Sequence, residues 1–396
     1  AAFISPLSQS VMLDINRPER HARAMSIWGM GIMIGPVLGP TLGGWLTESA
    51  NWRWVFYVNL PVGLITLVLM WALLPRTHTH ERKFDLFGFS MLALGLASLQ
   101  LMLDRGAQQD WFESAEIWIE LGVSVACLWM FLIHLLTARV TLFNRKMLAD
   151  RNLVMGMGFM IVIGVVMFSS MALLPPMLQR LFGWPVIDTG LVLAVRGIGI
   201  LMSMWVAGRL LGKIDARWMV GSGLLIAAYS LYQMSQWSLM MGTGPVVVSG
   251  LVQGLGMGLI FIPLNTMAFA TIPMQFRTDG SSLLNLFRSM GASVGISVVT
   301  TLLGSNTQTS HQDLVAHVTN SSVSLVDPST ADRFGIIGDV AMQMVNGEIN
   351  RQAAMVAYID DFWLMMWVTL AAVPLVVLLR PPRPGAAKAS AADMGH

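Results

Sequence analysis

Charged residues are scarce in this sequence. Only 12% of its 396 residues are Asp, Glu, Lys or Arg, and 55% are hydrophobic, whereas about 25% charged residues are usual in a soluble domain. Because the hydrophobic residues are spread over the whole length, we exclude a soluble globule and predict a membrane-embedded chain. The single cysteine, Cys127, excludes a disulfide within the chain.

The sequence also lacks the residue sets that catalysis requires. It shows no nucleophile–base pair, no phosphate-binding glycine loop and no cluster of metal ligands. His78 and His80 lie close together, but their short basic segment offers no further ligands. We therefore expect no enzyme, no metal site and no other cofactor.

Long apolar runs fill most of the chain. A membrane-crossing helix needs about 20 predominantly apolar residues. Ten stretches qualify, at about 24–46, 54–75, 85–104, 115–137, 153–174, 188–211, 219–238, 245–271, 280–303 and 356–380. Residues 1–13 have the character of the last half of a further span. The sequence therefore predicts an all-α membrane protein.

The basic residues predict how these spans are oriented. Of the 24 Lys and Arg residues, 17 fall in every second connecting segment, 5 in the alternating segments and 2 inside spans. Cytoplasmic loops carry an excess of Lys and Arg, so the basic set and the tail 381–396 are predicted to be cytoplasmic. The longest connector, 304–355, is polar and is expected to be a periplasmic loop, with room for an amphipathic helix at about 333–346.

Two segments 257 residues apart share a pattern of identical residues. The shared residues are Pro6, Leu7, Ile15 and Arg20 in the first copy and Pro263, Leu264, Ile272 and Arg277 in the second. Each copy ends one span and leads into a span with small residues at four-residue spacing. Chance is the alternative, but the matching topology favours an internal repeat, as in many transporters.

This repeat predicts two pseudo-symmetric six-helix bundles around a central cavity. Residues 152–380 form the second bundle, and residues 1–75 are the remainder of the first. Residues 76–151 hold two inserted helices that connect the bundles. On this interpretation the first three and a half spans of a 14-span protein are absent from the sequence.

The first complete span carries a series of small residues and prolines. The series consists of Gly31, Gly35, Gly39, Pro40, Gly43 and Gly44. Glycines four apart form a smooth stripe on a helix, which allows a neighbouring helix to approach closely. A plain packing face is the alternative to a functional seam. The series resembles the antiporter signature of the fifth span in proton-driven drug exporters of the major facilitator superfamily, with Ser26 in place of a further glycine.

The segments that flank this span extend the resemblance. Residues 13–20 and 51–61 are similar to those of the 14-span EmrB/QacA-type branch, and most of all to its EmrB-like permeases. The resemblance implies proton-driven export of lipophilic, often cationic, drugs from the bacterial inner membrane by alternating access. It also implies a periplasmic EmrA-like adaptor and a TolC-like outer-membrane channel as partners. The alternatives are a same-fold exporter of one specific metabolite and a non-transporting membrane fragment.

A predicted cytoplasmic loop carries a second family pattern. The segment from Gly208 and Arg209 to Asp215 and Arg217 resembles the second-half copy of the superfamily's loop motif, whose charge pairs latch the inward gate. Gly212 occupies the place of the usual acidic residue, so the latch would require Asp215 to pair with Arg209 or Arg217. An ordinary positively charged loop is the alternative.

Several polar residues fall inside predicted spans. Arg196 and Arg288 lie about eight residues into their spans, which is about 12 Å deep at about 1.5 Å per residue. A charge at this depth is functional by default, with a structural pair or snorkelling as the alternative. The candidates for the cavity, its substrate or its coupling are Arg196, Arg288, Asn285, Asn265, Gln253 and Gln9. Any one amide is also explained as a contact between helices, but Asn285 shares a helix face with Arg288.

Carboxylates are missing from the interiors of the predicted spans. The acidic residues nearest to spans sit at their predicted ends, where water reaches them, and are Asp85, Asp104, Glu116, Glu120, Asp188 and Asp361. A proton-coupled exporter needs a carboxyl group that burial helps to protonate. We therefore expect the proton carrier in the absent N-terminal spans, because the resemblance places an acidic residue in the first span. Asp188 and Asp361 are the alternatives.

Overall fold

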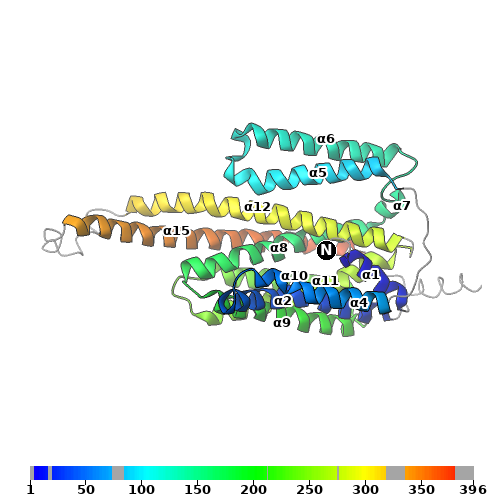
Figure 1. Ribbon diagram of the computed structural model, residues 1–396, viewed down its shortest axis with the longest axis horizontal. Helices are drawn as coiled ribbons and strands as arrows, with labels where there is room; N and C mark the ends of the chain where they lie inside the picture. The colour runs from blue at the N-terminus through cyan, green and yellow to red at the C-terminus, as the bar shows by residue number, and fades with distance from the viewer. Residues whose placement is uncertain are drawn as a thin grey trace, which may run out of the picture.

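A computed structural model (Figure 1) describes residues 4–16, 20–73, 84–211, 213–273, 276–317 and 335–379. Within these ranges the chain is helical, with no strand. The helices of the first part are α1 (Ile4–Ile15), α2 (His21–Ser49), α3 (Trp54–Tyr57), α4 (Asn59–Leu73), α5 (Leu86–Arg105), η2 (Gly106–Gln108), η3 (Trp111–Glu113), α6 (Ala115–Thr137) and α7 (Arg145–Leu148). The remainder are α8 (Arg151–Leu181), α9 (Val186–Leu210), α10 (Ala216–Ser235), α11 (Thr243–Ala270), α12 (Arg277–His317), α15 (Gly335–Ala372) and η5 (Pro374–Leu378).

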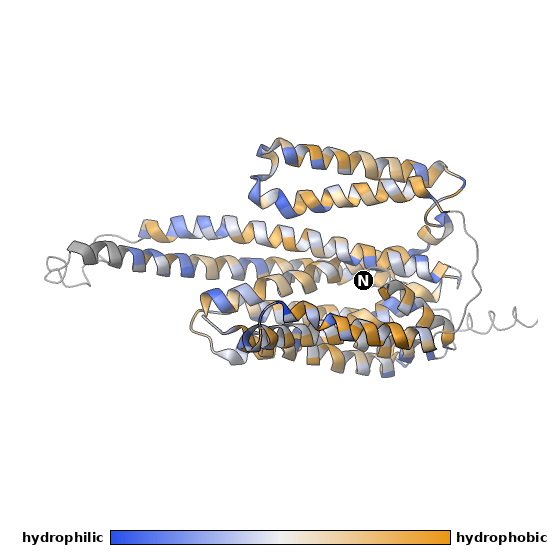
Figure 2. Ribbon diagram, viewed as in Figure 1, coloured by the Kyte–Doolittle hydropathy of each residue, from blue (hydrophilic) through white to orange (hydrophobic). Residues whose placement is uncertain are grey.

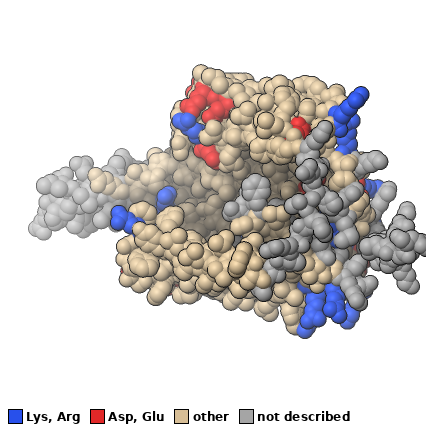
Figure 3. Space-filling view, turned by 45° about the vertical axis from the view of Figure 1, so that its right-hand side comes forward, with Lys and Arg blue, Asp and Glu red and all other residues tan. Residues whose placement is uncertain are grey.

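Each of the ten predicted spans is helical. In the described part of the chain, eight helical segments are long and apolar enough to cross a membrane; α2 and α10 are the expected spans that fall outside this set. Charged side chains gather toward the two ends of the face shown in Figure 3, and the surface between them is uncharged. Such a band suits contact with lipid.

The described residues of the connector 304–355 are helical, which corrects the prediction of a loop, and the helix expected at about 333–346 is present from Gly335 onward as the start of α15. Helix α12 continues to His317, and α15 begins at Gly335. The two extensions project together beyond the other helices (Figure 1), and their described residues are more hydrophilic than the bundle (Figure 2). The prediction used hydropathy, which locates only the apolar stretch that crosses the membrane. A helix can continue past that stretch through polar residues, because its backbone hydrogen bonds are made within the helix.

Glycines bring the helices of the second bundle into close contact. A methyl group added at Gly164 of α8 would meet the backbone of α12 at Arg288, and one added at Gly254 of α11 would meet the backbone of α9 at Arg196. Small residues at helix interfaces let backbones approach closely in membranes. The bundle of α8, α9, α10, α11, α12 and α15 is therefore held by tight backbone packing as well as by a buried apolar core.

The inserted helices form a hairpin at the edge of this bundle. Helices α5 and α6 pack on each other, and the hairpin lies beside α12 (Figure 1). Its contact with α12 includes a hydrogen bond of 2.9 Å from Ser297 Oγ to the Leu103 carbonyl. Asp85 caps α5 by accepting from the Gly88 N–H at 2.9 Å. Helices α5 and α6 therefore pack mainly on each other and contact the second bundle through α12.

Candidate functional site: a pocket between the two halves

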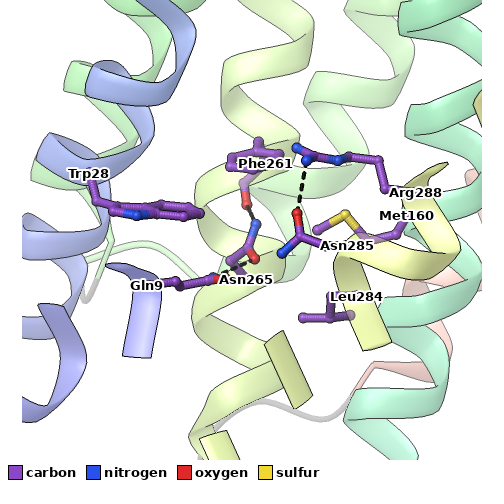
Figure 4. Close-up of a pocket in the computed structure, with 8 residues that line it drawn as sticks. All are labelled: Gln9, Trp28, Met160, Phe261, Asn265, Leu284, Asn285 and Arg288. Carbon is purple, nitrogen blue, oxygen red and sulfur yellow. Dashed lines mark hydrogen bonds between the residues drawn. The ribbon is translucent and has the colours of Figure 1, made fainter. Parts of the chain in front are cut away.

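A small pocket lies where the first part of the chain meets the second bundle. Helices α1 and α2 form one wall, and α8, α11 and α12 form the other (Figure 4). Its lining residues are Gln9, Trp28, Met160, Phe261, Asn265, Leu284, Asn285 and Arg288. Four of these, namely Gln9, Asn265, Asn285 and Arg288, were predicted as cavity residues from the sequence.

Buried amides connect the two walls. Gln9 of α1 donates from Nε2 to Oδ1 of Asn265 on α11 at 3.0 Å, and it accepts from Ser281 Oγ of α12 at 2.5 Å. Asn265 in turn donates to the Phe261 carbonyl at 2.7 Å. Gln9 is 1% exposed and Asn265 is 2% exposed. The Gln9 side chain therefore holds α1 against both α11 and α12.

Arg288 brings the positive charge of the pocket. Its Nη2 donates to Asn285 Oδ1 at 2.8 Å, and Asn285 donates to the Ser281 carbonyl at 2.9 Å. The guanidinium lies over the ring of Phe261, 5.9 Å from its centroid. Within the described part of the chain no carboxylate forms an ion pair with Arg288. Its charge is thus met by an amide and a ring, and it remains available to a ligand.

Aromatic rings line the pocket beside these polar groups. The rings of Trp28 and Phe261 stack at 6.4 Å with an interplanar angle of 13°, and Trp28 Nε1 donates to Ser8 Oγ at 2.9 Å. The sequence prediction omitted Trp28. The repeat offset of 257 residues relates Trp28 to Asn285 and Ser8 to Asn265. Applying the repeat to the second-half candidates would have identified this wall.

Two predicted cavity residues, Arg196 and Gln253, lie elsewhere. Both are inside the second bundle, where Arg196 Nη2 reaches the Met167 carbonyl at 3.3 Å and Gln253 Nε2 donates to Ser170 Oγ at 3.2 Å. Arg196 Nη1 and Gln253 Oε1 are buried without a partner in the described structure. These residues form a second polar cluster between α8, α9 and α11 rather than a part of the pocket.

In the described structure most of the glycine stripe of α2 does not contact the second bundle, which corrects its predicted close packing; Gly44 alone of the stripe makes that contact. Methyl groups added at Gly31, Gly35, Gly39 and Gly43 would meet open space, whereas one added at Gly44 would contact Val186 and Ile187 at 3.5 Å. The side chain of Pro40 is outside the described residues.

Helix α2 packs on α9 through a different face. Ser26 Oγ donates to the Met204 carbonyl at 2.6 Å, and Thr41 Oγ1 donates to the Gly190 carbonyl at 3.2 Å. Ser26 stands where the family signature has a glycine, so its hydroxyl makes a contact that glycine cannot make.

The predicted gate loop shows capping in place of ion pairs. Asp215 accepts from the backbone N–H of Arg217 at 3.0 Å and caps α10. Gly208 and Arg209 belong to the last turn of α9, and the Arg209 guanidinium lies 3.5 Å from the centroid of the Trp205 ring. In the described structure Asp215 pairs with neither arginine side chain, so the proposed latch is not formed here.

Two carboxylates are less exposed than the sequence predicts. Asp85 is 8% exposed and Asp361 is 1% exposed, although both were expected at wet span ends, whereas Asp104 and Asp188 are exposed as expected. Asp361 was misplaced because its span was taken to start at residue 356, while α15 starts at Gly335. His78 and His80 lie outside the described residues, and no metal-binding group of His, Cys, Asp or Glu occurs within them.

A membrane-spanning helical bundle with a polar and aromatic pocket between its two parts has the architecture of a multi-span membrane transporter. Residues 1–296 match the model of the Major Facilitator Superfamily. The chain belongs to this superfamily.

Curated relatives agree with this assignment. Over 391 residues the chain is 31% identical to the fatty acid resistance protein FarB of Neisseria gonorrhoeae and 30% identical to the multidrug export protein EmrB of Haemophilus influenzae. Each match covers 96% of this chain and 76% of the relative. EmrB of Escherichia coli is 28% identical, over 96% of this chain and 75% of its own length. A crystal structure of a bacterial homologue of the human lysosomal transporter Spinster overlaps 94% of this chain and 74% of its own, with 18% identity and a TM-score of 0.48.

Proposed function

We propose that the protein is a proton-driven efflux permease that exports lipophilic compounds by alternating access. The observation that carries this proposal is the position of the pocket, whose lining comes from both halves of the chain. In transporters built from repeats, the substrate site lies between the repeats, and rocking of one against the other changes which side can reach it. Rocking here would separate Gln9 and Trp28 from Asn265 and Arg288.

The relatives support export over import. Two are named for multidrug export and one for resistance to fatty acids. The pocket suits such cargo because the Trp28 and Phe261 rings offer apolar surface beside a few polar groups, which is the usual composition of small-molecule sites.

The charge of the pocket favours one group of lipophilic compounds. Arg288 is the single charged residue among the eight that line it. A lone guanidinium attracts a carboxylate or other anion and repels a cation. We therefore assign amphipathic anions as preferred substrates, in contrast to the cationic drugs that the family resemblance implies.

The position in the cell follows from the basic residues. We propose a bacterial inner-membrane location with a cytoplasmic C-terminus. This orientation places the projecting ends of α12 and α15 on the periplasmic side, where an EmrA-like adaptor would bind, with a TolC-like channel beyond it.

Transport by the complete gene product in liposomes tests the proposal. A lipophilic anion, a lipophilic cation and a panel of metabolites are compared, each with and without an imposed pH gradient. The proposal predicts gradient-driven transport of several lipophilic compounds, with the anion preferred. Transport of one metabolite alone would establish the specific exporter instead, and transport that ignores the gradient would refute proton coupling.

A further inference from the structure

Asp361 is a carboxyl group that the proposed pocket does not use. It lies on α15, inside the membrane-spanning stretch Val345–Leu378, and is 1% exposed. Both of its carboxyl oxygens are buried without a hydrogen-bond partner in the described structure. Its neighbour Asp360 is exposed. The two carboxyl groups are therefore neighbours on one helix, but only that of Asp360 is exposed.

Helix α10 packs on α15 close to Asp361. The ring of Trp237, which follows α10, makes an edge contact with Phe362 at 5.6 Å between centroids. Trp237 Nε1 and Gln233 Oε1 are also buried without partners. Arg217, in the first turn, is the sole charged residue of α10, so this helix brings polar atoms but no charge to the level of Asp361.

At the level of Asp361, helices α8 and α12 bring no carboxylate, and the cation considered on α8 is Arg180, near the end of that helix. Arg351 donates to the Leu181 carbonyl at 2.9 Å, which places the end of α8 one to two turns outward of Tyr358. Tyr358 interacts electrostatically with both Asp361 and Arg180. On α12, the contact of His311 with Asn346 sets an antiparallel register.

This register puts the segment 291–301 of α12 opposite Asp361, and that segment contains no titratable residue. Among the described residues, the charged groups nearest in this register are thus Asp360 on the same helix and Arg180 at the end of α8. Neither forms a hydrogen bond to it in the described structure. Within the described part of the chain, no partner therefore compensates an ionised carboxylate at this site.

An ionised carboxylate that has left water without gaining a donor is strongly disfavoured, whereas the neutral acid tolerates burial. We propose that Asp361 is a proton-binding site of the second bundle, loaded in the arrangement described here, in which its carboxyl oxygens are buried, and emptied when movement of α15 against α10 admits water. Binding needs one proton from solvent and breaks no other bond. The part of this site in transport rests on the proposed proton-driven export, but proton binding itself does not.

Infrared spectroscopy of the purified complete protein tests proton binding directly. At neutral pH, the wild type is expected to show the carbonyl stretch of a protonated carboxyl group. Asp361→Asn should lose this band, and Asp360→Asn, the matched control, should keep it. An identical band in wild type and Asp361→Asn, or no such band in wild type, overturns the proposal.

Asp361→Glu tests the assignment even if Asp361→Asn does not fold. Asp361→Glu retains a carboxyl group, so its band should persist at a shifted frequency; an unshifted band overturns the assignment to Asp361. In liposomes, Asp361→Asn is expected to lose gradient-driven transport while keeping substrate counterflow, and Asp360→Asn to keep both. If the wild type transports nothing, the proposed function fails while the infrared result still decides the proton site.

Discussion

Gln9 and Asn265 form a hydrogen bond of 3.0 Å between residues 256 positions apart in the chain. This bond joins the remainder of the first half to the second bundle at the floor of the pocket. Since Gln9 also accepts from Ser281, one side chain closes the seam between three helices. These bonds, together with those of Ser26 to Met204 and of Thr41 to Gly190, must break when the two parts separate, as alternating access requires.

Replacing Gln9 should therefore loosen the seam. Gln9→Ala leaves Asn265 Oδ1 and Ser281 Oγ without their partner, and hydrogen bonds between membrane helices contribute about 0.6 kcal/mol each on average. We expect a free energy of unfolding lower by about 1–2 kcal/mol, together with slower transport. Thermal unfolding in detergent and transport in liposomes measure the two effects. Gln100→Ala is the control, because Gln100 is exposed and bonds within its own helix; equal effects of the two changes would contradict the prediction.

Arg288 should decide the charge of the cargo. Arg288→Gln removes the positive charge, so export of a lipophilic anion should fall by about tenfold or more, as expected when an ionic contact of about 1.5–3 kcal/mol is lost. Arg288→Lys keeps the charge but loses the planar guanidinium that reaches Asn285. Its anion export should lie between that of wild type and that of Arg288→Gln. Arg53→Gln is a matched control, since Arg53 is an exposed arginine that also lies over a ring, that of Trp52. Undiminished anion export by Arg288→Gln would exclude the pocket as the anion site.

The positions of the helices were predictable from the sequence, because a stretch of about 20 apolar residues has few stable structures in lipid other than a helix. The polar ends of α12 and α15 were not predictable in this way, because a helix that continues into water need not be apolar. The error at Asp361 has this origin, because the start of the span was taken as the start of the helix.

The pocket was predictable in part. Asn285 and Arg288 share a helix face, and the structure joins them as expected. Arg196 and Gln253 lie outside this pocket, which periodicity could not predict: α9 and α11 are largely apolar all round, so the side facing the seam looks like the side facing the bundle interior. The face of α2 that carries Gly39 was misassigned for the same reason.

Close backbone contact should make Gly164 sensitive to substitution. A methyl group at Gly164 would lie 2.8 Å from the Ala292 amide nitrogen and closer still to the Arg288 carbonyl, and backbone atoms cannot move aside easily. Gly164→Ala is expected to destabilise the protein by about 1–3 kcal/mol. Gly158→Ala on the same helix is the control, because a methyl group there meets no atom within 4 Å. Thermal unfolding in detergent measures both, and equal midpoints would argue against the tight α8–α12 contact.

Asp85 should make the α5–α6 hairpin sensitive to acid. Its carboxylate accepts from the Gly88 and Leu142 amides at 2.9 and 3.0 Å and lies 3.0 Å from His134 Nε2. Burial raises the pKa of Asp85, but the bonds from Gly88, His134 and Leu142 together outweigh burial and hold this pKa below its ordinary value. A carboxyl group with a lowered pKa stabilises the folded state fully above its unfolded pKa of about 3.9.

That contribution starts to fall below about pH 4 and is lost as the pH falls through the lowered pKa of the folded state, so the hairpin should stay closed at neutral pH and open in acid. Cys127, the one cysteine of the chain, is buried on α6 and reports opening by its rate of thiol labelling. We expect Asp85→Asn to label faster than wild type at neutral pH and to lose most of the acid dependence. Asp104→Asn, at the exposed far end of α5, should label as wild type does. The ratio of the wild-type labelling rate to that of Asp85→Asn should rise in acid, and this ratio cancels the effect of pH on the thiol itself. A ratio that does not change with pH would show that the Asp85 bonds do not hold the hairpin together.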